Sequence, residues 1–375
     1  ELKKYKLISV HIDLPENKKT YFVSKIKIND PNYEYFNNIK YNIKHKEYNI
    51  DNLSIQLSYK CNLNCVHCFQ NKDENNIEVS ADDAVNIIEQ AYNIGVDSVI
   101  LSGGECTICK DFLEIAKFIR SKHLKLTIIT NGKKLSEDNE LFNQIIKLYP
   151  HEIQVSLYSM NPDVHDAITG QKGSQNKTLK AINKLRNQGI NVSIAIMQLK
   201  DNIKDVTEVR KFAKKINAGI KSSHLFINNI NKNNKYVKSD CKNFYQIYIQ
   251  ENSIKYRNPE EIVLNSYICE EAIHNINITP NLDVTPCIDI NYKLGNFKET
   301  SLYDIYNDIL PEFRKTFINK NRKECFKHKY CKVCIFCPVN SIYECNGFFG
   351  KSEMLCEEAK AYYEFYKKHK NGIQR

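Results

Sequence analysis

Three cysteines stand close together in the chain, at Cys61, Cys65 and Cys68, in the spacing CxxxCxxC. Thiolates are the usual ligands of iron–sulfur clusters, and three of them bind only three of the four irons of a cubane cluster. The remaining iron is then open to a small chelating molecule. A structural zinc site needs four ligands, and His67 in the same segment would complete one. The spacing therefore predicts a cluster with one open iron, with a closed zinc site as the alternative.

A second and larger group of cysteines lies in the C-terminal part of the chain. Its members are Cys269, Cys287, Cys325, Cys331, Cys334, Cys337, Cys345 and Cys356. Eight thiolates are enough for two fully ligated 4Fe–4S clusters. One cluster with spare cysteines, or a zinc ribbon built from the CxxC pairs, are the alternatives, because spacing alone separates these metals poorly. Disulfides are not expected, since the chain is long and its 14 cysteines gather at ligand spacings.

The elements that would position the first three cysteines follow a repeated strand–loop–helix order. Apolar patterns predict strands at residues 53–59, 96–103, 124–132, 152–159, 191–198 and 219–227. Helical periodicity predicts helices at residues 80–95, 111–123, 139–149, 178–189 and 205–216. Such alternation requires a parallel sheet with helices outside it. Six units predict an α/β fold with a partial, open (β/α)6 barrel of the TIM type, whose active site lies at the C-terminal ends of the strands.

Three segments are expected along the chain. Residues 1–50 alternate apolar and polar side chains and are interpreted as a β-rich N-terminal segment. Residues 51–228 form the partial barrel. Residues 229–375 form a cysteine-rich iron–sulfur domain that begins in an asparagine-rich loop and ends in a helix at residues 357–369.

Glycines and polar residues follow the later strands at the same rim. In Ser102–Gly103–Gly104–Glu105, the glycines let a ligand approach the backbone closely, and the carboxylate can accept hydrogen bonds from an ammonium group. Asn131 lies between Thr130 and Gly132 after the third strand. Ser156 and Tyr158 alternate on the fourth strand and therefore point to one face. A strand-end turn and plain barrel lining are the ordinary structural readings of these motifs.

In this order the motifs resemble the radical S-adenosylmethionine (SAM) superfamily, over residues 50–360. The resemblance implies that the open iron binds the methionine part of SAM. One electron then cleaves SAM to a 5′-deoxyadenosyl radical, which takes a hydrogen atom from the substrate. The implied SAM contacts are Phe69, Gly103, Gly104, Glu105, Asn131, Ser156 and Ser174.

The stretch that supplies Ser174 runs from His165–Asp166 through Gly170 to Gly173, and it resembles the peptide-modifying branch of the family. One position departs from the family pattern, because Cys106 replaces the usual proline after Glu105. We interpret Cys106 and Cys109 as plain buried or loop thiols, with extra ligands or reactive groups as the alternatives. Cys241 is interpreted as a surplus thiol, with a hydrogen-atom donor as the alternative.

The second cysteine group resembles the SPASM extension of radical SAM enzymes, in which a short hairpin ends in a cysteine and Leu-Gly-Asn comes after it. Here the hairpin ends in Cys287, and Leu282 stands where the family has a glycine. The later spacing also departs, since Cys331, Cys334 and Cys337 succeed one another at intervals of three. The resemblance implies one or two auxiliary 4Fe–4S clusters, in addition to the SAM-binding one, and leaves the partition of their ligands open.

The combination implies an enzyme that modifies a peptide or protein, and we expect maturation of a ribosomally made peptide by crosslinking, thioether formation or epimerisation. An anaerobic sulfatase-maturating type of enzyme and a small-molecule dehydrogenase are the alternatives. A non-catalytic electron-transfer protein fits less well, because it needs no open iron or ligand pocket. The expected partners are a peptide substrate and a reduced flavodoxin or ferredoxin that donates electrons.

Composition and charge limit the binding partners and the compartment that are expected for this chemistry. The net charge is +10, but the lysines are scattered and lack the interleaved aromatics of a nucleic-acid groove, so no nucleic acid is expected. No apolar run reaches the roughly 18 residues of a membrane helix, so no membrane partner is expected. Cysteines at ligand spacings and the lack of an apolar signal core at the start indicate the reducing cytoplasm.

Overall fold

A computed structural model describes residues 50–68, 76–199, 201–223, 267–269, 271–290, 292–331, 334, 336–345 and 347–369. All of them belong to one compact unit, residues 47–375. The predictions for Phe69, for Cys241 and for nearly all of the β-rich segment 1–50 lie outside the described residues, as does the boundary expected at 228.

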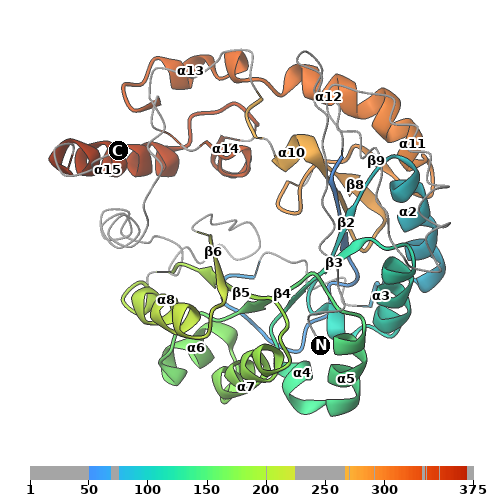
Figure 1. Cartoon of the computed structure of the whole chain (residues 1–375). Coiled ribbons are helices and arrows are strands. Elements are labelled where there is room, and N and C mark those ends of the chain that lie inside the picture. The colour runs from blue at the N-terminus through green and yellow to red at the C-terminus, as the bar shows by residue number, and fades with distance from the viewer. Residues whose placement is uncertain are drawn as a thin grey trace, which may run out of the picture. The chain divides into compact units, whose positions relative to one another are not determined.

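Six parallel strands form the greater part of the sheet, as the alternation predicts (Figure 1). They are β1 (Asn52–Gln56), β2 (Ser98–Ser102), β3 (Lys125–Thr130), β4 (Glu152–Ser156), β5 (Val192–Met197) and β6 (Gly219–Ser223). Each pairs in parallel with the next in the chain. Leu53 and Ile55 of β1 and Val99 and Leu101 of β2 are fully buried, as expected where a parallel sheet is covered on both faces.

The predicted helices are present on the outer side of these strands (Figure 1). They are α2 (Ala81–Asn93), α3 (Phe112–Ser121), α5 (Asn139–Lys147), α7 (Ser174–Asn187) and α8 (Val206–Lys215). The predicted cap of α2 is confirmed, because the Ser80 hydroxyl accepts a hydrogen bond from the Asp83 N–H. Two short helices were not predicted, α4 (Lys133–Glu137) and α6 (Pro162–Thr169), and α7 begins at Ser174 and not at residue 178.

The C-terminal part continues the same sheet on the other side of β1. A short helix, α10 (Glu271–His274), leads into β7 (Asn275–Ile278), which pairs in parallel with β1. Strands β8 (Asp283–Thr285) and β9 (Gly295–Asn296) extend the sheet in antiparallel order. Leu282, at the position of the family's glycine, has a φ of +64° in the turn before β8. Leu282, which is buried, therefore adopts the left-handed backbone conformation for which glycine is better suited.

Helices make up most of the described chain after β9. They are α11 (Leu302–Asp304), α12 (Leu310–Thr316), α13 (Lys323–Phe326), α14 (Pro338–Cys345) and α15 (Glu353–His369). The helix expected at residues 357–369 is confirmed as part of α15. Within the described ranges, no helix has the length and apolar character needed to cross a bilayer.

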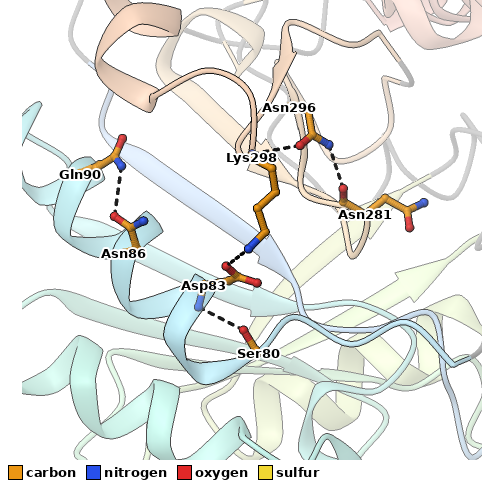
Figure 2. A network of polar contacts seen from close by, with 7 residues as sticks. All are labelled: Ser80, Asp83, Asn86, Gln90, Asn281, Asn296 and Lys298. Carbon is orange, nitrogen blue, oxygen red and sulfur yellow. Dashed lines mark hydrogen bonds and ion pairs between the residues drawn. The ribbon is translucent and has the colours of Figure 1, made fainter.

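Helix α2 is joined to the segment after β9 by polar contacts (Figure 2). Lys298 Nζ forms an ion pair with Asp83, whose side chain is 24% exposed, and Gln90 Oε1 accepts a hydrogen bond of 2.9 Å from the Leu302 N–H. Asn296 Nδ2 donates to Asn281 O and Asp283 Oδ1 in the same hairpin. The contacts of Lys298 and Leu302 with α2 connect the barrel part to the cysteine-rich part.

The ion pair and the helix cap in Figure 2 differ in expected strength. We expect Lys298→Met to lower the free energy of unfolding by less than about 1 kcal/mol, because an exposed ion pair is screened by water. Ser80→Ala removes the cap and is expected to cost about 1 kcal/mol. Anaerobic urea titration of both variants tests this order, and a larger loss for Lys298→Met would show that the ion pair is desolvated.

Candidate metal centre and cofactor site

The first cysteine group lies on the loop directly after β1. Cys61, Cys65 and Cys68 form no disulfide and are partly exposed. All three act electrostatically on Tyr158, a buried residue just beyond β4. Burial raises the pKa of Tyr158 well above its usual value, and charge on Cys65, Cys68 and Cys61 raises it further. The structure thus brings these cysteines together at the C-terminal end of the sheet, where the barrel prediction expects chemistry.

The loop is held against β2 by the two glycines of the Gly-Gly-Glu segment. The Gly104 N–H donates to Ser58 O at 2.7 Å, and the Glu105 N–H donates to Lys60 O at 2.9 Å. A Cβ atom on Gly103 would lie 2.5 Å from Ser58 O, and one on Gly104 would lie 2.6 Å from Tyr59 O. The glycines therefore admit the backbone of the cysteine loop. Their contact with SAM stays a prediction.

The end of α6 also holds the cysteine loop, and this contact was not predicted from the sequence. The N–H groups of Asn64 and Val66 donate to Thr169 O and Ile168 O at the end of α6. Gly170 ends this helix with φ +67°, and a Cβ atom there would lie 2.6 Å from Asn64 O. The loop is therefore clamped between the end of β2 and the end of α6. Gly170, which follows His165–Asp166, was the sequence feature that could have indicated this contact.

Glu105 is buried at the centre of a hydrogen-bond network. Its Oε1 accepts from Thr107 Oγ1 at 2.6 Å and from Thr130 Oγ1 at 2.7 Å, and its Oε2 accepts from the Asn131 N–H at 2.7 Å. Burial raises the pKa of Glu105, and these hydrogen bonds oppose the rise. The carboxylate joins the ends of β2 and β3, and Oε2 has acceptor capacity left for a further donor.

Asn131 turns toward the cysteine loop. Its Nδ2 donates to Asn62 Oδ1 at 2.7 Å and lies 3.9 Å from Cys61 Sγ. Hydrogen bonds to a ligating sulfur tune the electronic properties of an iron–sulfur cluster. Asn131 is thus placed to donate a hydrogen bond toward a thiol of the first cysteine group. Its predicted contact with SAM stays a prediction.

Ser156 and Tyr158 share one face, as their alternation predicts, and the Ser156 hydroxyl is hydrogen-bonded to that of Tyr158. The rings of His67 and His165 pack against Tyr158, with centroids 4.8 Å and 5.5 Å away. Burial lowers the pKa of His165 to about 4, so it is neutral at physiological pH. These aromatic side chains form one wall beside the three thiols.

Ser174 lies at the start of α7 and is buried. Its hydroxyl donates to Asp166 Oδ1 at 2.9 Å and is 2.6 Å from Thr169 Oγ1. Asp166 also accepts from the Gln175 N–H at 2.9 Å. The His-Asp and Gly-Ser motifs therefore join the end of α6 to the start of α7, and the SAM contact of Ser174 stays a prediction.

Cys106 and Cys109 follow Glu105 in the chain, at the two ends of a short helical turn. Cys106 is fully buried, and its Sγ lies 3.3 Å from Ile129 O. Burial raises the pKa of Cys106 well above its usual value and that of Cys109 to about 12. Both thiols are therefore protonated at neutral pH, as expected for plain buried cysteines.

The second cysteine group divides into two sets. Burial raises the pKa of Cys287 and of Cys337, and each is raised further by the proximity of Cys269 and Asp289. We call Cys269, Cys287 and Cys337 the hairpin cysteines. The α15 cysteines are Cys325, Cys331, Cys334, Cys345 and Cys356.

Direct contacts define the α15 cysteines. Cys325 Sγ and Cys345 Sγ contact Gly350 O and Lys351 O, just before α15, at 4.0 Å and 3.4 Å. Cys334 Sγ lies 4.0 Å from Leu355 O in that helix. Cys356 interacts electrostatically with Cys325 and Cys331. No three His, Cys, Asp or Glu side chains in the described ranges converge on one point as the ligands of a single metal ion do.

Two family models match the chain. Residues 55–213 match the radical SAM superfamily, and residues 269–338 match the SPASM iron–sulfur cluster-binding domain. The chain therefore belongs to the radical SAM superfamily. Within it, the chain is one of the members that carry a SPASM-type iron–sulfur domain.

Curated relatives differ in how much of their length is matched. AlbA of Bacillus subtilis, an antilisterial bacteriocin subtilosin biosynthesis protein, is 25% identical over 82% of this chain and 70% of AlbA. The AdoMet-dependent heme synthase of Methanosarcina barkeri is 30% identical over 44% of this chain and 47% of the synthase. The chain thus spans about half the length of the second relative.

A solved structure shares the fold. SuiB of Streptococcus suis, in complex with S-adenosylmethionine, superposes with a TM-score of 0.63 at 21% identity, covering 83% of this chain and 77% of SuiB. SuiB has also been solved with its precursor peptide SuiA. At this identity the likeness establishes the partial-barrel fold with its cysteine-rich extension.

Proposed function

We propose that this protein cleaves SAM reductively and abstracts a hydrogen atom from a side chain or the backbone of a ribosomally synthesised peptide. The product would be a crosslinked, thioether-containing or epimerised peptide. The observation that carries the proposal is the gathering of Cys61, Cys65 and Cys68 at the rim of the sheet, beside the buried carboxylate of Glu105. The peptide as substrate class is supported by the similarity to AlbA over most of the chain.

The residues present fit a cluster with one open iron. Cys61, Cys65 and Cys68 are unpaired by disulfides and partly exposed, and the loop that carries them is clamped on two sides. The chemistry that the cluster and SAM would supply is one-electron cleavage of the sulfonium bond to a 5′-deoxyadenosyl radical. A reduced flavodoxin or ferredoxin is the proposed electron donor.

The protein's own residues would bind and shield the reactants. The free acceptor capacity of Glu105 Oε2 suits the ammonium group of SAM, because a buried carboxylate forms strong charge-assisted hydrogen bonds. Asn131 orients the cysteine loop through Asn62. Tyr158, with His67 and His165 packed on it, excludes water from the side of β4.

Glu105→Gln tests the first of these roles. The amide keeps the shape of the side chain but removes the charge that would pair with the ammonium group. We expect SAM to bind about 10- to 100-fold more weakly, the equivalent of one hydrogen bond to a charged group, while iron content is unchanged. Equilibrium binding of SAM to the reconstituted protein measures this, and an unchanged dissociation constant would remove Glu105 from the SAM site.

Two assays on the anaerobically reconstituted protein test the proposed function. The first reduces it with dithionite in the presence of SAM and measures 5′-deoxyadenosine. The second adds short peptides encoded next to its gene and monitors their mass, because crosslinking lowers the mass and epimerisation in deuterated water raises it. Cleavage of SAM without any change in a peptide would argue against the peptide substrate and leave the radical chemistry in place.

A small-molecule substrate is the second candidate. It is favoured by the similarity to the heme synthase, at 30% identity over 44% of this chain. The anaerobic sulfatase-maturating type is the protein-directed alternative, and a sulfatase-derived peptide in the same mass assay separates it from the precursor peptides.

A further inference from the structure

The hairpin cysteines are one ligand short of a closed cluster. Cys269, Cys287 and Cys337 interact with one another, whereas the α15 cysteines gather elsewhere. Eight cysteines are therefore divided three and five, and not four and four. A closed 4Fe–4S centre needs four protein ligands. The contacts of the other five cysteines are with residues 350–355 or with one another.

A carboxylate occupies the vicinity of these three thiols. Asp289 interacts electrostatically with Cys287 and with Cys337, and its own N–H is hydrogen-bonded to the Cys287 sulfur. It lies in a turn closed by the hydrogen bond of 3.3 Å from the Ile290 N–H to Cys287 O. Thr285 Oγ1 donates to Cys287 O at 3.0 Å, and Gln56 Nε2 donates to Ile288 O at 3.4 Å. Both sides of the turn are therefore fixed, and Asp289 is held beside the thiols.

The side chain of Asp289 is only partly exposed to water. No ion pair or side-chain hydrogen bond to Asp289 occurs among the residues that the structure describes. Asp283, only six positions earlier in the same hairpin, illustrates the usual arrangement, since its Oδ1 is 2.7 Å from Lys293 Nζ. A carboxylate that is partly withdrawn from water and has no such partner is costly unless a cation is bound there.

The position of Cys337 suits the same site. It directly precedes α14, and its sulfur accepts hydrogen bonds from the N–H groups of Val339 and Asn340 in the first turn. These hydrogen bonds hold the Cys337 sulfur in place on one side of the site, and the turn at Cys287 places the carboxylate.

We infer that Asp289 is the fourth protein ligand of an auxiliary iron–sulfur cluster held by Cys269, Cys287 and Cys337. The inference rests on the proposed function only in that the cysteine-rich domain must bind clusters. Iron accepts carboxylate oxygen, but the bond is weaker and more labile than one to thiolate. The cluster would therefore have one distinct iron, which exchanges ligands more readily than the other three.

The test uses the full-length chain with Cys61, Cys65 and Cys68 changed to alanine, so that only auxiliary clusters contribute. In this background we expect Asp289→Ala to lose about one iron per chain after anaerobic gel filtration with a chelator, since one iron of four loses its ligand. Asp289→Cys should keep all its iron and resist one-electron oxidation by ferricyanide. The parent of these two variants, which keeps Asp289, should release one Fe²⁺ on that oxidation. It should then show the electron paramagnetic resonance signal of a [3Fe–4S]⁺ cluster. Asp283→Ala is the matched control and should behave as its parent.

The inference is overturned if Asp289→Ala matches its parent in iron content, in the electron paramagnetic resonance spectrum of the reduced protein and in its response to ferricyanide. It is also overturned if Cys241→Ala, and not Asp289→Ala, loses the iron, because Cys241 would then be the fourth ligand. Failure of the proposed function is distinguishable, since SAM cleavage is measured separately on the protein that retains Cys61, Cys65 and Cys68.

Discussion

Replacement of Cys61, Cys65 and Cys68 by alanine is expected to abolish formation of 5′-deoxyadenosine and to remove about four irons per chain, the content of one 4Fe–4S cluster. Without these thiolates no iron is held at the rim of the sheet. The auxiliary sites should be unaffected, because their cysteines lie on other elements. Iron and sulfide analysis, together with chromatography of the products of reduced protein and SAM, measures both effects.

Cys109→Ala is the matched control for loss of a thiol near the same site. Cys109 is only four residues beyond Glu105 in the chain, but burial keeps its thiol protonated and its Sγ lies 3.9 Å from Glu105 O. We expect this variant to retain its iron and its SAM cleavage. If Cys109→Ala lost as much iron as the triple variant, or if the triple variant still cleaved SAM, the assignment of the catalytic cluster would be wrong.

The position of the first cysteine group could be predicted because it depends on local patterns. A buried strand ends at Gln56, and the chain beyond it must emerge at the C-terminal rim of a parallel sheet. The clamp formed by the end of α6 could not be predicted in the same way. It depends on backbone hydrogen bonds between Asn64 and Thr169, residues far apart in sequence, and backbone groups leave no trace in the residue types.

The partition of the auxiliary cysteines illustrates the same limit. Cys334 and Cys337 are neighbours in the sequence, yet the first lies by α15 and the second precedes α14 and belongs with Cys269 and Cys287. The spacing of the cysteines shows how many thiols are present, but not which helices and strands bring them together. Pairing of β7 with β1, which brings the hairpin to the barrel, joins strands more than 200 residues apart and was likewise not predicted.

The glycines show a different relation between sequence and structure. At Gly103 and Gly104 the residue types predicted that a ligand comes close to the backbone. What approaches in the structure is the backbone of the cysteine loop, at Ser58 and Lys60. The requirement for glycine is therefore also a requirement for placing the cluster ligands.

Gly104→Ala is accordingly the second variant with a large expected effect. The added Cβ would lie 2.6 Å from Tyr59 O and would also collide with Lys60 O, and backbone atoms in a clamped loop cannot move aside cheaply. We expect the loop to be displaced, with a loss of about 1–3 kcal/mol of stability and failure to hold the catalytic cluster. Iron content, SAM cleavage and the thermal midpoint of the reconstituted variant measure these effects.

Gly189→Ala separates this effect from backbone strain. Gly189 has φ +74°, and a Cβ atom added there would have nothing within 4 Å, so alanine costs about 1 kcal/mol of strain without a collision. This control should lower the thermal midpoint yet keep its full iron content and SAM cleavage. Equal iron in Gly104→Ala and Gly189→Ala would mean that the cysteine loop tolerates displacement, and the clamp would then contribute to stability alone. A selective loss of the catalytic cluster in Gly104→Ala would instead show that close contact between the loop and the end of β2 is what holds the three thiols in place.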